Sequence, residues 1–137
     1  MQSLKSADGK FVLEQGLESL HAENKVFQSN VEFWKREMQF LDHLLVKNEP
    51  FVKTERNKKE LEHFQNRLIY YRGEVLDQLL HDLREAEHKL AANMQTEHAD
   101  ESVYRTQHNA SADAIKSFQK VYNEFKEELF TFIEHLT

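Results

Sequence analysis

The stretch LEQGLESLHAENKVFQSNVEFWKREMQFLDHLL, residues 13–45, decides the fold because apolar side chains recur in it at alternating intervals of three and four. Nine of its ten periodic positions are apolar, and the tenth is Asn24. The series consists of Leu13, Leu17, Leu20, Asn24, Phe27, Val31, Trp34, Met38, Leu41 and Leu45. Such intervals place side chains on one face of an α-helix, as in the seam of a coiled coil. The stretch therefore predicts one long helix that packs in a bundle.

Two later segments repeat this pattern, and short polar stretches separate the three. We expect helices at about 11–47, 54–97 and 101–136, after a flexible leader at residues 1–10. Pro50 ends the first helix, since the residue before a proline is driven out of the α region. Similar helix lengths and short connections favour an up-down-up arrangement. The expected fold is all-α, an elongated antiparallel three-helix bundle in one domain over 11–137, with oligomerisation as a route to a larger bundle.

The middle helix contains a shift in its apolar register. Its expected core positions include Val75, Leu79 and Leu83, whose two successive intervals of four break the alternation of three and four. Gly73 directly precedes this shift. A glycine at such a place indicates either a kink or a close approach by another backbone, and a split into two helices is a further alternative.

Composition excludes several classes of function. The 137 residues include 24 acidic and 18 basic side chains, a formal net charge of -6, and the two signs are mixed along the chain. Nucleic acids and anionic membranes are bound by clustered cations, so neither is an expected partner. No run approaches the roughly 20 apolar residues of a membrane span, and no secretion signal is recognisable. Without cysteine, a disulfide or thiolate site is impossible. A cytoplasmic protein is the expectation.

Catalytic motifs are equally sparse. There is no Gly-x-Ser-x-Gly turn, and the three glycines are isolated, so no glycine-rich loop exists to hold phosphate. Carboxylates are numerous, but pairs at intervals of four are typical of solvated helix faces. We therefore expect neither enzymatic activity nor a cofactor.

A metal-binding bundle of the ferritin-like or hemerythrin-like type is the alternative function. Its candidate ligands on the middle helix are Asp77, His81, Glu85 and His88, which follow one another at intervals of three or four. Imidazole and carboxylate groups on one helix face suit zinc or iron. However, His81, Glu85 and His88 lie roughly 140 to 160° from the apolar face at 100° per residue, so they are expected to point at solvent.

A second apolar stripe gives the first helix a sharper functional signal. Val26, Phe33 and Phe40 recur every seven residues, about 130° from the main seam, and Leu44 lies between the two. Tyr70 and Phe130 also lie outside their seams and at a similar expected height. We expect these residues to form a surface for self-association or for a protein partner. The alternative is that the rings fold back and cover the edges of the bundle.

Asn24 is the one polar residue in the seam of the first helix. A buried asparagine at such a position fixes the register or the number of partners at some cost in stability. We therefore expect Asn24 to be a specificity residue.

Overall fold

The computed structural model describes the backbone of residues 5–93 and 101–136 and the side chains of residues 16–92 and 102–136. These parts of the chain are helical throughout apart from short connections, and they contain no strand. The elements are α1 (Lys5–Lys47), the 3₁₀ turn η1 (Glu49–Phe51), α2 (Glu55–Tyr70), the π-helical segment η2 (Tyr71–Val75), α3 (Leu76–Asn93) and α4 (Glu101–Leu136).

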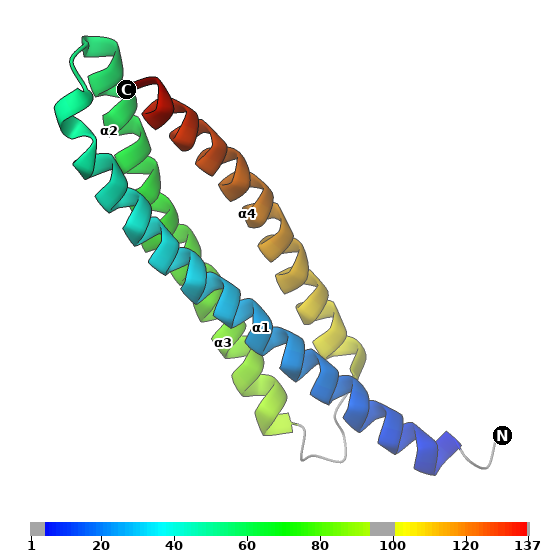
Figure 1. Ribbon diagram of the computed structural model, residues 1–137. Helices are drawn as coiled ribbons and strands as arrows, with labels where there is room; N and C mark the ends of the chain where they lie inside the picture. The colour runs from blue at the N-terminus through cyan, green and yellow to red at the C-terminus, as the bar shows by residue number, and fades with distance from the viewer. Residues whose placement is uncertain (1–4, 94–100, 137) are drawn as a thin grey trace.

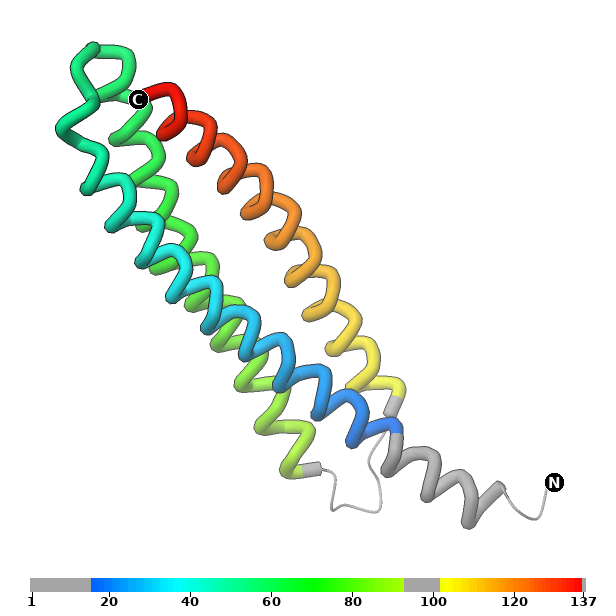
Figure 2. The backbone as a smooth tube through the Cα atoms, viewed as in Figure 1, coloured from blue at the N-terminus to red at the C-terminus, as the bar shows by residue number. Residues whose placement is uncertain are grey.

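The helices form an elongated three-helix bundle, which confirms the predicted all-α, up-down-up fold. α2, η2 and α3 follow one another as one rod that runs antiparallel to α1, and α4 returns in the direction of α1 (Figure 1). The backbone trace in Figure 2 shows that α4 ends beside the start of α2. Among the described helices, none is long and apolar enough to cross a membrane.

The connection between α1 and α2 has side-chain caps at both ends. The Asn48 side chain donates Nδ2–H to the Leu44 carbonyl over 2.8 Å, which satisfies one of the free carbonyls at the end of α1. At the start of α2 the Thr54 hydroxyl accepts the Asn57 backbone N–H over 3.1 Å. Thr54 is thus an N-cap.

The start of α1 differs from the prediction of a leader at residues 1–10. The helix begins at Lys5, so Asp8 and Gly9 lie inside it. A glycine inside a helix costs about 1 kcal/mol relative to alanine, which does not by itself end a helix. Whether the leader is flexible stays a prediction.

The π-helical segment η2 explains the register shift around Gly73. A π turn contains one more residue than the neighbouring α turns, so the two core positions that directly follow it move by one, while Leu83 stays in the predicted register. Leu76 and Leu80 are buried, whereas the predicted Val75 and Leu79 are only half-buried. A Cβ added to Gly73 would meet nothing within 4 Å. The alternative of a close backbone approach at Gly73 is therefore wrong.

The core follows the predicted seam of α1, apart from Leu13, which lies outside the described side chains, and it includes Ile115, Phe118, Tyr122, Phe125, Leu129 and Phe132 of α4. Most of it is one cluster from Val31 to the α1–α2 turn, rich in aromatic rings from α2 and α4. A second, small cluster of Leu17, Leu20 and Leu90 lies towards the opposite end. Asn24 is between the two and is only 4% exposed.

Candidate functional site

The apolar stripe on α1 is exposed along its length. The exposed fractions are 56% for Val26, 61% for Phe33 and 62% for Phe40. The rings of Phe33 and Phe40 therefore do not fold back over the bundle, and that alternative is wrong. Leu44 differs, because it is half-buried and packs against the core.

Ion pairs and hydrogen bonds place this stripe on the side of α1 that faces α4. Phe33 and Phe40 are four residues before and three after Glu37, and these intervals put side chains on one side of a helix. Glu37 Oε1 accepts hydrogen bonds from Tyr122 Oη over 2.6 Å and from Lys126 Nζ over 3.0 Å. The stripe therefore borders the junction of α1 with α4.

The structure divides the remaining predicted surface residues between two sides of the bundle. Phe130 is 42% exposed and follows Lys126 by four residues, so it lies on the same side as Phe33 and Phe40. Tyr70 is 52% exposed and follows Arg67 by three residues. The Arg67 side chain contacts α4 at Glu128, on the opposite flank of α4 from the contacts with α1. Tyr70 therefore does not share a face with the α1 stripe.

The contacts of Tyr122 and Arg67 hold α4 against its two neighbours. Burial raises the pKa of the Tyr122 hydroxyl, and its hydrogen bond to Glu37 raises it further. Arg67 Nη1 donates to Glu128 Oε2 over 2.8 Å, and its guanidinium lies 4.6 Å from the centre of the Phe125 ring. Burial acts to lower the pKa of Arg67, but its hydrogen bonds to Glu128 and Tyr71 outweigh this effect and raise the pKa.

Asn24 is the centre of a polar layer that joins α1 to α3 and to α4. Its Nδ2 donates to the Leu83 carbonyl and to Glu87 Oε2, each over 3.1 Å. The other Glu87 oxygen contacts His21 Nδ1. These contacts link α1 to α3, and the role of Asn24 as a specificity residue stays a prediction.

The same layer reaches α4 through His108. Its Nε2 pairs with Glu23 Oε2, and its ring stacks on Phe27 with the ring centres 5.3 Å apart. His108, a position on the α4 seam, is thus a half-buried imidazole with a carboxylate partner.

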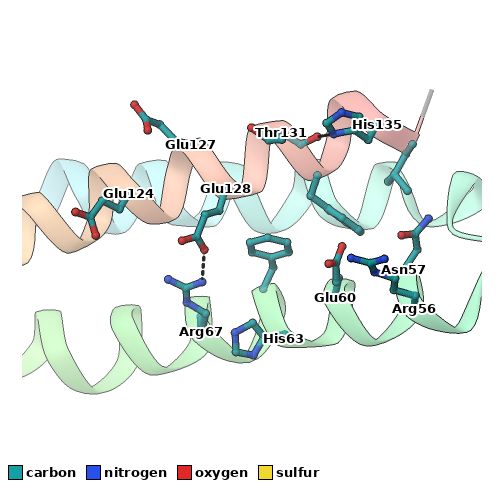
Figure 3. Close-up of a pocket in the computed structure, with 13 residues that line it drawn as sticks. Arg56, Asn57, Glu60, His63, Arg67, Glu124, Glu127, Glu128, Thr131 and His135 are labelled. Carbon is teal, nitrogen blue, oxygen red and sulfur yellow. Dashed lines mark hydrogen bonds and ion pairs between the residues drawn. The ribbon is translucent and has the colours of Figure 1, made fainter.

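The sequence did not indicate the groove between α2 and α4, which has a volume of about 860 Å³ (Figure 3). In Figure 3 the α2 wall lies opposite the α4 wall, and the Arg67–Glu128 ion pair bridges them. Below the rims, the rings of Phe64 and Phe132 lie 5.2 Å apart between their centres. The groove is lined by Arg56, Asn57, Glu60, His63, Phe64, Arg67, Glu124, Glu127, Glu128, Thr131, Phe132, His135 and Leu136.

The candidate metal ligands do not converge. Asp77 forms an ion pair with Lys35 of α1, and His81 approaches Glu85 at 3.8 Å on the solvent side of α3. His88 is exposed. Within residues 16–92 and 102–136, no group of three or more His, Asp or Glu side chains is arranged to hold a metal ion.

Comparisons with protein-family models, with curated proteins and with solved structures gave no match.

Proposed function

We propose that this chain is a non-enzymatic, cytoplasmic protein-interaction module that self-associates through the α1 stripe, defined as Val26, Phe33 and Phe40 with Phe130 beside it. The observation that carries this proposal is the exposure of Phe33 and Phe40, each more than 60% exposed on a helix whose other outer positions are largely polar. Two turns separate them, so one partner helix can contact both.

The energetics of exposed phenylalanine support the proposal. Full burial of one such side chain is worth roughly 1.5–3 kcal/mol, and the bundle itself gains little of this at Phe33 and Phe40. A contact with another protein that buries these two side chains gains this free energy. The hydrogen bonds of Glu37 to Tyr122 and Lys126 hold the stripe beside α4 in a fixed position, which lowers the entropy lost on association.

A second copy of the chain is a geometrically suitable partner. Val26 and Phe40 are placed symmetrically seven residues on either side of Phe33. In an antiparallel pair centred on Phe33, the two phenylalanines at the centre meet and each Val26 faces a Phe40. A twofold contact of this kind uses the same patch on both subunits.

Sedimentation equilibrium tests this function with matched variants. Wild type is expected to associate as its concentration rises, and Phe33→Glu with Phe40→Glu is expected to stay monomeric. The control is Phe51→Glu with Ile69→Glu, which introduces the same charges at two exposed apolar positions away from the stripe. A wild type that remains monomeric at several hundred micromolar, or a control that dissociates equally, would contradict the proposal.

A further inference from the structure

A second groove, the α3–α4 groove, lies between α3 and α4 and has a volume of about 320 Å³. Leu79, Leu83 and Ala86 of α3 line one side of it, and Ala110 and Ala114 of α4 line the other. The alanines end at a single methyl group, so the space opposite the two leucines stays open. Sites for small molecules are mostly apolar recesses of roughly 300–1,000 Å³, and the α3–α4 groove falls within this range.

A small polar pocket adjoins the α3–α4 groove and extends it towards α1. It shares Ala86, Gln107 and Ser111 with the groove, and it is also lined by Asn24 and His108. Its volume is about 20 Å³, which is enough for one water molecule or one hydroxyl group, since a water needs roughly 10–15 Å³. The combined site therefore has an apolar body and a polar inner end.

Asn24 offers an unpaired acceptor to the polar pocket. Its two Nδ2 hydrogens are donated to the Leu83 carbonyl and to Glu87 Oε2. No residue that the structure describes donates a hydrogen bond to its Oδ1. Asn24 is only 4% exposed, and a buried acceptor without a donor is costly. A hydroxyl group that enters the polar pocket would supply this donor.

The rim of the α3–α4 groove carries both signs of charge. Asp82 and Glu85 lie on it together with Lys89. The Asp82 carboxylate accepts a hydrogen bond from Gln78 Nε2 over 2.9 Å, and Glu85 approaches His81 Nε2 at 3.8 Å. Because both signs are present and both carboxylates have polar neighbours, the rim selects neither a cation nor an anion. The site therefore favours a neutral ligand.

We propose that the α3–α4 groove and the polar pocket together bind a small neutral alcohol or phenol. Its hydroxyl group donates to Asn24 Oδ1, and its apolar body of one or two rings lies against Leu79 and Leu83. An apolar cavity of about 150 Å³ accepts benzene, so a groove of about 320 Å³ has room for such a body. No residue of the α1 stripe lines this site, so binding does not depend on self-association.

The probe is 4-ethylphenol, and its methyl ether is the matched compound without a hydrogen-bond donor. Titration of the phenol into ¹⁵N-labelled protein is expected to shift backbone amides within 79–89 and 107–114 until the site is saturated. The phenol is expected to bind at least fivefold more tightly than the ether, because a site that hydrogen-bonds a hydroxyl group discriminates against an analogue without it. Equal affinities, no saturable shifts, or shifts centred on another part of the bundle would overturn the proposal.

Filling the α3–α4 groove locates the ligand. Ala110→Leu with Ala114→Leu places two larger side chains in the groove and is expected to weaken the binding of 4-ethylphenol at least tenfold. The control is Ala91→Leu with Ala92→Leu, which makes the same change at two exposed positions of α3 that line neither part of the site. An equal loss of affinity in both variants would contradict the site.

Two further measurements complete the test. Unchanged helical circular dichroism verifies that the leucine variants fold, and if they do not, the comparison of the phenol with its ether in wild type still decides. Phe33→Glu with Phe40→Glu is expected to bind 4-ethylphenol as wild type does. A loss of binding in this variant would contradict the independence of the site from the α1 stripe.

Discussion

Near the α1–α2 turn the three rods pack through aromatic rings, whereas towards the other end they are joined through a polar layer. In the aromatic half, Phe125 lies edge-on to Phe64 and Tyr71 within one continuous core. In the polar half, Asn24 and His108 occupy seam positions, and among the side chains that the structure describes a small leucine cluster lies beyond them. The same three rods run through both halves.

We expect the two halves to play different parts, one in the stability of the fold and the other in the alignment of its helices. Apolar packing is strong and non-directional, so it constrains the helix register less than a directional contact does. A hydrogen bond such as that from Asn24 to the Leu83 carbonyl forms at one register only, and its loss leaves a buried group unpaired. We therefore expect the aromatic half to supply most of the free energy of folding and the polar layer to fix how the helices align.

The largest expected effect is the loss of an aromatic ring from the core. Phe125→Ala removes a fully buried side chain and is expected to lower the free energy of unfolding by about 3–5 kcal/mol in urea titration. Hydrogen exchange should become faster throughout the described helices. For Leu20→Ala in the small cluster, faster exchange should be confined to the polar end. Equal spread of the effect in both variants would contradict the division into halves.

Removing the central amide of the polar layer is expected to have a smaller effect. Asn24→Ala leaves the Leu83 carbonyl and Glu87 without this donor and should cost about 1–3 kcal/mol. The matched control is Asn30→Ala on the exposed side of α1, with an expected change below about 0.5 kcal/mol. If thermal or urea unfolding gave the two variants the same stability, Asn24 would not be a structural determinant.

Tyr122 makes stability depend on alkaline pH. In the folded protein, burial and Glu37 raise the pKa of Tyr122 above its ordinary value of 10.0. Below pH 10 the contribution of Tyr122 to the free energy of unfolding is therefore fully present. Above pH 10 the phenol ionises only in the unfolded chain, and stability falls by about 1.4 kcal/mol per pH unit for this group. Tyr122→Phe should lack this part of the decline. Parallel urea titrations of both proteins from pH 9 to 11 would reveal it, and identical slopes would contradict it.

The smallest effect is expected for the exposed histidines of α3. His81→Ala with His88→Ala should change the free energy of unfolding by less than about 0.5 kcal/mol, because both side chains are exposed. Dialysis against a chelator should leave the melting temperature of wild type unchanged. A fall in the melting temperature after chelation, reversed by zinc or iron, would support the metal-binding alternative.

The sequence predicted the parts of the fold that depend on one helix at a time. The alternation of three and four placed Trp34 and Phe125 in the core, and the angle from the seam predicted that Phe33 and Phe40 lie outside it. It failed at Leu76 and Leu80, because a π turn adds a residue that apolar periodicity alone does not reveal.

The candidate sites were harder to predict because they depend on the spacing between helices. Glu124 and Glu127 look like members of an ordinary solvated face, and the groove exists only because α2 and α4 stand apart above Phe64 and Phe132. The sequence predicts that Tyr70 and Phe33 share a surface because they lie at similar heights along the bundle. Height does not specify the side of a helix, and the contact of Arg67 with Glu128 places Tyr70 elsewhere.

The most direct test of the central claim, that copies of this chain meet through the α1 stripe, is intermolecular paramagnetic relaxation. Because the chain has no cysteine, Ser29→Cys provides a single thiol for a spin label on α1, between Val26 and Phe33. In a mixture of labelled protein and unlabelled ¹⁵N protein, signals from amides around Val26, Phe33 and Phe40 should broaden. The absence of broadening at concentrations where the protein associates, or broadening confined to α2 and the far side of α4, would contradict the account.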